Sequence, residues 1–119
     1  MLERKIYMKK MTSTKGEVVA IFKGILEEIG IEYSSILLFG SRARNDSGEE
    51  SDWDFMIIIK DRIDLGERRG LWYKVYRRFH DHFPTIPVDI ILKDEQSFES
   101  EKRVANTIAN EVYLEGIEV

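Results

Sequence analysis

The most constraining feature of this 119-residue sequence is a run of five apolar residues, Phe55–Ile59, that directly follows two aspartates. The segment Asp52–Lys60 begins with polar alternation and becomes continuously apolar and β-branched. That profile is typical of a strand running from a solvent-exposed end into a core. The run is far shorter than the ~18 apolar residues that indicate a membrane span. We therefore expect a sheet-containing protein with no membrane association.

Apolar periodicity predicts further helices and strands on both sides of this strand. Apolar residues spaced three and four apart are typical of amphipathic helices, and short apolar runs ended by Gly or Pro are typical of strands. The predicted helices cover residues 14–29, 65–83 and 96–115, the other strands cover 35–39 and 88–92, and residues 40–51 form a loop or one short helical turn.

This order of elements predicts an α/β (α+β) fold with a small, mixed three-stranded sheet flanked by about four helices. The second and third strands should be parallel, because a helix connects them. The relative direction of the first and second strands stays open, because a dozen connecting residues permit either. We expect one domain over residues 14–119, preceded by a flexible or irregular arm at residues 1–13, which lack periodicity.

Composition excludes several classes of function. The sequence contains no Cys, so disulfides, thiolate zinc sites and thiol nucleophiles are excluded, and a reducing cytoplasm is the expected location. It carries 18 basic and 22 acidic residues, a formal net charge of −4. Non-specific nucleic-acid binding relies on many Lys and Arg, so we expect no direct nucleic-acid binding.

Three aspartates stand where strands are expected. Asp52 and Asp54 are two residues apart and so project from the same face of a strand, and Asp89 interrupts the third strand. Each one alone is typical of a turn or a strand edge. If the two strands are neighbours, however, the three carboxylates converge, and such oxygen clusters select Mg²⁺ or Mn²⁺. Two such ions can assist an in-line phosphoryl displacement.

A second pattern follows the first predicted strand. Gly40 and Ser41 there would expose backbone N–H groups and a hydroxyl that suit a phosphate, and Arg42 and Arg44 add positive charge. Taken singly, these residues are also typical of a turn with a serine N-cap and of solvated surface arginines.

Together, the motif Gly40-Ser41, ten residues, Asp52-Trp53-Asp54 and then Asp89 resembles the minimal nucleotidyltransferases of the polymerase-beta-like superfamily. The sequence departs from that pattern at Asn45, where the family usually has Gly, and at Trp53, where it has an aliphatic residue. Asn tolerates left-handed backbone, and we expect Trp53 to pack against a helix on the face opposite the carboxylates.

The resemblance implies a metal-dependent transfer of AMP from ATP. Asp52 and Asp54 would bind two Mg²⁺ ions, with Mn²⁺ as a substitute, and Asp89 would complete the site and help to activate the attacking hydroxyl. Gly40 and Ser41 would hold the β- and γ-phosphates, with Arg42 and Arg44 beside them.

Stand-alone members of this family resemble antitoxins that pair with a HEPN-type toxin. The resemblance therefore implies a hetero-oligomer with such a toxin and transfer of AMP to a toxin tyrosine. Two alternatives stay open: a non-enzymatic antitoxin that inhibits its partner by binding, and nucleotidyl transfer to a small-molecule hydroxyl.

Large apolar residues exceed what one helical stripe needs. They are either core residues or part of an interface, and the sequence alone leaves that choice open: Trp72, Tyr73, Tyr76, Tyr113 and Leu114.

Overall fold

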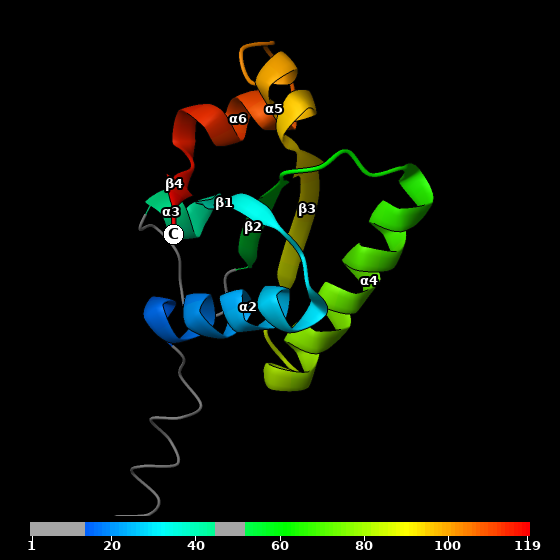
Figure 1. Cartoon of the computed structure of the whole chain (residues 1–119). Coiled ribbons are helices and arrows are strands. Elements are labelled where there is room, and N and C mark those ends of the chain that lie inside the picture. Colours follow the sequence, from blue (N-terminus) through cyan, green and yellow to red (C-terminus); the bar gives the residue numbers. More distant parts are fainter. Residues whose placement is uncertain (1–13, 45–51) are drawn as a thin grey trace, which may run out of the picture.

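The structure is a computed structural model that describes residues 14–44 and 52–119 (Figure 1). The predicted arm at residues 1–13 and the departure at Asn45 lie outside the described residues. Within the described part of the chain, no helix is long and apolar enough to cross a membrane.

A mixed sheet forms the centre of the fold. Its order is β3-β2-β1-β4, and the strands are β1 (Tyr33–Phe39), β2 (Trp53–Ile59), β3 (Val88–Asp94) and β4 (Ile117–Glu118). β2 and β3 are parallel, as predicted, whereas β1 is antiparallel to both β2 and β4. The sheet therefore has four strands instead of the predicted three. β4 is only two residues long, too short to give a periodic signal.

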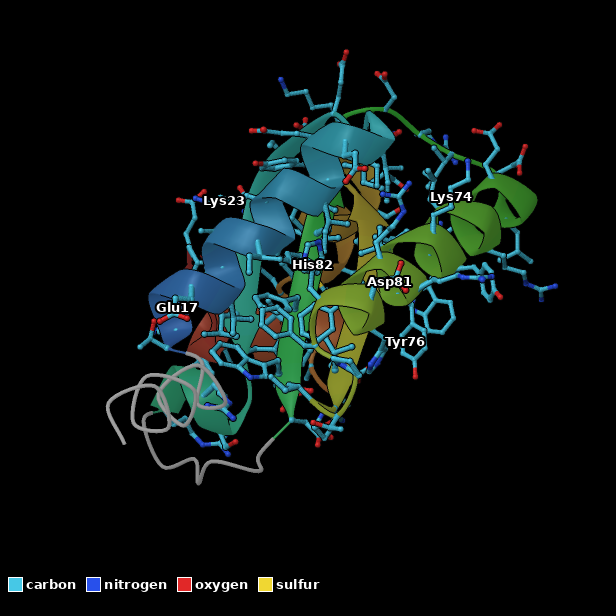
Figure 2. All side chains as sticks on the ribbon, turned by 90° about the horizontal axis from the view of Figure 1, so that it is seen from below. Glu17, Lys23, Lys74, Tyr76, Asp81 and His82 are labelled. Carbon is cyan, nitrogen blue, oxygen red and sulfur yellow. The ribbon has the colours of Figure 1, made fainter. Side chains whose placement is uncertain are left out.

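Helices α2 (Lys15–Ile29) and α4 (Leu65–His82) cover one face of the sheet, and Figure 2 shows them side by side in front of the strands. Thr14 begins α2 by accepting a hydrogen bond from the Glu17 amide, 3.2 Å away. Gly30 ends α2 with a left-handed φ of 87°, which permits its amide to reach the last carbonyls. Alternate strand residues face these helices and form the larger core cluster, which includes Phe22, Phe55, Phe79 and Ile90.

Helices α5 (Glu95–Glu101) and α6 (Ile108–Glu115) cover part of the opposite face. The smaller core cluster lies beneath them and consists of Phe39, Met56, Ile58, Phe98, Ala109 and Val112. Consecutive strand residues alternate between the two clusters because side chains of a strand point to opposite faces. The end of this second face that carries Asp54 holds the candidate site.

The prediction of a single helix over residues 96–115 is wrong, because the helix is interrupted between α5 and α6. Asn106 adopts a left-handed φ of 67°, and Thr107 begins α6 by accepting a hydrogen bond from the Asn110 amide at 3.0 Å. These local side-chain interactions compete with continuation of the helix. Consequently Ala105 and Ile108, which one continuous helix would turn toward the sheet, are exposed.

Candidate active site

Three aspartates lie at the end of the sheet where β2 and β3 begin. Asp54 and Asp89 are direct partners in the parallel pairing of β2 with β3, and Asp52 stands two residues before Asp54. Trp53 and Phe55 are buried on the α2–α4 side, so the aspartates project from the other face. The structure thus brings together the three carboxylates that the sequence singled out, and their chemical roles remain predictions.

The carboxylate of Asp54 lies in a repulsive environment. Burial raises the pKa of Asp54 above its ordinary value of 3.8, and the negative charges of Asp89, Asp52 and Glu111 raise it further. Arg44 acts in the opposite direction, with the smallest effect of the five. The side chains around Asp54 therefore supply too little positive charge to stabilise its ionised form, and a cation would stabilise it.

Gly40 lies directly against Asp54. Its φ is 71°, a conformation that favours glycine, and a methyl carbon in its place would overlap Oδ2 of Asp54 and stand 3.2 Å from Cγ. This contact arises because Phe39, the last residue of β1, is the register partner of Asp54 in β2. Only a residue without a side chain leaves the carboxylate in its present position.

Residues 40–51 were predicted to form a loop or one short helical turn, and a helical turn, α3 (Ser41–Arg44), follows Gly40. The amides of Ala43 and Arg44 donate to the Gly40 carbonyl at 3.1 and 3.3 Å. This turn holds Ser41 one residue from Gly40, at the end of β1 that adjoins Asp54. The arrangement suits phosphate binding by Gly40 and Ser41, which remains a prediction.

The two arginines of α3 have different surroundings. The Arg42 guanidinium carbon lies 4.2 Å above the ring of Trp53, whereas Arg44 forms an ion pair of 3.6 Å with Glu115 of α6, which Figure 1 shows near α3. Trp53 is 2% exposed and packs in the cluster shared with α2 and α4, which confirms the expected helix contact. Arg44 also lies close enough to the carboxylates to lower the pKa of Asp54, whereas Arg42 anchors α3 to the core.

Sequence reasoning missed Glu111. This residue lies in the first turn of α6, and its negative charge raises the pKa of Asp54. It escaped notice because one continuous helix was expected over residues 96–115. The pair Asn106-Thr107, a left-handed residue followed by an N-cap residue, was the available signal for a new helix start.

The donor set suits a hard cation such as Mg²⁺. The available donors are carboxylate oxygens, which Mg²⁺ prefers. Among residues 14–44 and 52–119, no three acidic or histidine side chains are grouped closely enough to hold an ion by themselves. Mg²⁺ is commonly bound by one or two carboxylates together with substrate phosphates and water, so this open arrangement fits an ion that arrives with a nucleotide.

A cavity of about 420 Å³ lies on the same face of the sheet, between β1 and the helices α5 and α6. Its lining includes Ser35, Phe98 and Tyr113. None of the seven predicted site residues lines it, so it is separate from the carboxylate cluster.

Comparison with known proteins agrees with this geometry. Residues 25–115 match the family described as "Polymerase beta, Nucleotidyltransferase". A Methanocaldococcus jannaschii protein named as a putative protein adenylyltransferase is 29% identical over 107 residues, covering 87% of this chain and 99% of that protein.

Two solved structures match this chain. A crystal structure of a toxin–antitoxin with AMP-PNP has a TM-score of 0.57 at 19% identity, covering 83% of this chain and 69% of that one. A putative nucleotidyltransferase from Sulfolobus solfataricus has a TM-score of 0.49 at 24% identity, covering 85% and 80%. With a family match over well more than half of its length and this arrangement of glycine and aspartates, the chain belongs to the polymerase beta nucleotidyltransferase family.

Proposed function

We propose that this nucleotidyltransferase transfers AMP from ATP to a hydroxyl group of a partner protein. The observation that carries the proposal is the pairing of Asp54 with Asp89 beside Gly40, at the edge of the sheet where β1 ends and β2 and β3 begin. Family membership supports nucleotidyl transfer. The name of the M. jannaschii relative, which covers nearly the same length of chain, supports adenylyl transfer to protein.

In this proposal the residues act by position and charge. Gly40 and Ser41 bind the β- and γ-phosphates of ATP, and the α-phosphate lies against Asp54. Arg44 adds positive charge beside the phosphates, and Arg42 assists nucleotide binding by holding the Gly40–Ser41 turn against Trp53. The acceptor hydroxyl oxygen bonds to the α-phosphorus, the bond from phosphorus to the bridging oxygen breaks, and pyrophosphate leaves. The hydroxyl proton passes to an Asp89 carboxylate oxygen. Such catalysis depends mainly on positioning and charge stabilisation.

Two Mg²⁺ ions, or Mn²⁺ in their place, would be held by Asp52, Asp54 and Asp89 together with the phosphates. When bound, they would neutralise negative charge on the phosphates and carboxylates. The raised pKa of Asp54 supports this part of the proposal, because burial, and after it the negative charges of Asp89, Asp52 and Glu111, disfavour the ionised carboxylate that a cation would stabilise.

For the acceptor we propose a tyrosine of a HEPN-type toxin, so that the pair forms a hetero-oligomer and this chain is its antitoxin. The toxin–antitoxin structure with AMP-PNP, similar in fold, supports a toxin as the partner and ATP as the donor. Modification of the toxin hydroxyl would then silence it. Simple occlusion of the toxin and transfer to a small molecule are the competing outcomes.

The test is to incubate this protein with ATP, Mg²⁺ and the protein encoded next to it, and to measure intact masses. We expect the neighbour to gain one or more AMP groups with the wild type and none with Asp54→Asn. Asp81→Asn is the matched control, because Asp81 is exposed on α4, on the far side of the sheet (Figure 2), and it should transfer AMP as the wild type does. A neighbour that gains no AMP, and is still neutralised by Asp52→Ala, overturns the enzymatic proposal in favour of occlusion. Pyrophosphate release that requires a small-molecule alcohol overturns it in favour of the other alternative.

A further inference from the structure

Helix α4 carries a strip of exposed aromatic side chains. Trp72 and Tyr76 are each 36% exposed, and their rings stack with centroids 4.9 Å apart. The Tyr76 ring packs edge-on against the His80 ring, with centroids 4.5 Å apart, and Leu65 of the same helix is 61% exposed. Figure 2 shows Tyr76 pointing away from α2. Stacking holds these rings in place before any partner arrives, which lowers the entropic cost of binding.

Trp72 also ties this strip to the edge of the sheet. Its indole Nε1 donates a hydrogen bond of 2.9 Å to the Ile90 carbonyl of β3, and β3 is an edge strand. That carbonyl is therefore already engaged, which opposes the addition of another strand at this point. A partner would bind here through side chains.

A cavity of about 290 Å³ lies between α4 and the edge of β3. Its lining is Arg68, Arg69, Trp72, Ile90, Ile91 and Leu92. The apolar members suit an inserted apolar side chain of a partner, and the two arginines suit carboxylates beside it.

The charge on α4 is opposite to that of the chain as a whole. α4 contains five basic and two acidic residues, whereas the chain has a net charge of −4. Arg68 and Arg69 line the cavity beside Trp72, so positive charge adjoins the aromatic strip. This surface thus complements an acidic protein surface with an apolar centre. A polynucleotide is disfavoured, because the chain as a whole has a net charge of −4.

The strip is continuous with the candidate active site. Ile90, which accepts the Trp72 hydrogen bond, directly follows Asp89, so their Cα atoms are only ~3.8 Å apart. The strip lies on the α4 side of this edge, and the Asp89 carboxylate projects from the other face. A protein seated over the strip can therefore reach around the β3 edge and present a hydroxyl to Asp89.

We propose that this α4–β3 edge, formed by Arg69, Trp72, Tyr76 and the adjoining cavity, is the docking surface for the protein that carries the acceptor hydroxyl. An apolar side chain of that protein fills the cavity, and its acidic side chains lie against Arg68 and Arg69. The inference rests on the proposed function, because it assigns the surface to the acceptor of AMP.

The test compares two substitutions with the same charge change on one helix. Arg69→Glu and the exposed Lys74→Glu are matched, but Lys74 lies on a different side of α4 from Tyr76 (Figure 2). Steady-state AMP transfer to the protein encoded next to this chain, its binding measured calorimetrically, and ATP binding are the three readouts. We expect Arg69→Glu and Tyr76→Ala each to raise the KM and the Kd for the neighbour by about tenfold or more. Both variants should leave kcat and ATP binding unchanged, and Lys74→Glu should stay within about twofold of wild type.

The outcomes separate this inference from the proposed function. Wild-type transfer with an unchanged KM in Arg69→Glu and Tyr76→Ala overturns the docking surface alone. A neighbour that binds through the strip yet gains no AMP supports the surface and overturns the proposed function, whereas a neighbour that does not bind overturns both. Self-association of this chain that Tyr76→Ala abolishes, or RNA binding that Arg69→Glu abolishes, would assign the strip to another occupant and overturn the inference. If Tyr76→Ala lowers the thermal midpoint, Arg69→Glu alone decides the docking surface.

Discussion

Replacement of Gly40 by Ala tests how tightly the backbone and the Asp54 carboxylate are fitted together. The new methyl carbon would overlap Oδ2 of Asp54, and that oxygen would have to retreat by roughly 1 Å to reach an ordinary van der Waals contact. Misplacement of a reacting group by about 1 Å can cost on the order of 100-fold in rate. We therefore expect Gly40→Ala to lower kcat for AMP transfer about 100-fold.

The cost in stability should be much smaller than the cost in rate. Alanine in a left-handed conformation costs about 1–2 kcal/mol, and the overlapping atom is the end of a side chain that can rotate away. A domain of this size loses roughly 3–6 °C of thermal midpoint per kcal/mol. The thermal midpoint should then fall by about 3–12 °C. Circular dichroism measures this fall, and a cooperative transition shows that the variant is folded.

Gly30→Ala is the matched control. Gly30 also has a left-handed φ, of 87°, but a methyl group there would meet nothing within 4 Å. It should lower the thermal midpoint by a similar amount and leave AMP transfer unchanged. Wild-type activity in Gly40→Ala would refute the reasoning, and so would an equal loss of activity in Gly30→Ala.

Three further predictions concern stability. Asp54→Asn should raise the thermal midpoint at pH 7 without added metal, because the raised pKa of Asp54 makes its ionised form destabilising; this gain should disappear below pH 3.8, and an equal gain at every pH would contradict it. Gly24→Ala and Gly70→Ala, at helical positions where a methyl group meets nothing within 4 Å, should each add about 0.5–1 kcal/mol in urea unfolding, and a loss would contradict this. Asp94→Ala should remove about 1 kcal/mol at pH 7 by deleting the α5 cap, which accepts the Ser97 amide at 2.8 Å. The same hydrogen bond lowers the pKa of Asp94, so wild type should keep this advantage above pH 3.8 and lose it only as the pH falls through that lowered pKa; an advantage that persists below it would contradict this.

Local signals were sufficient for the centre of the fold. The apolar run after Asp54 predicted β2, and the helix that follows it predicted the parallel pairing with β3. The alternation of side chains along a strand then predicted that Asp52 and Asp54 share one face and that Trp53 lies on the other. These features depend on strand periodicity and chain connectivity, which are written in short stretches of sequence.

Features that depend on tertiary contacts could not be predicted in this way. Trp72 and Tyr76 have helical periodicity whether they face a core or solvent, and the position of α4 at the edge of the sheet leaves them exposed. Glu111 raises the pKa of Asp54 only because α6 starts anew at Thr107 and packs over Phe39 and Met56. The close approach of Gly40 to Asp54 follows from the register between β1 and β2, which sequence periodicity does not specify.

The most direct measurement of the central claim uses ATP labelled on either the α- or the γ-phosphate. The wild-type protein is incubated with Mg²⁺ and the protein encoded next to it, and label retained on protein is measured after denaturation. We predict that the α-label is retained, that the γ-label leaves as pyrophosphate, and that Asp54→Asn retains neither. Retention of the γ-label, or equal retention of the α-label by wild type and Asp54→Asn, would contradict AMP transfer by this site.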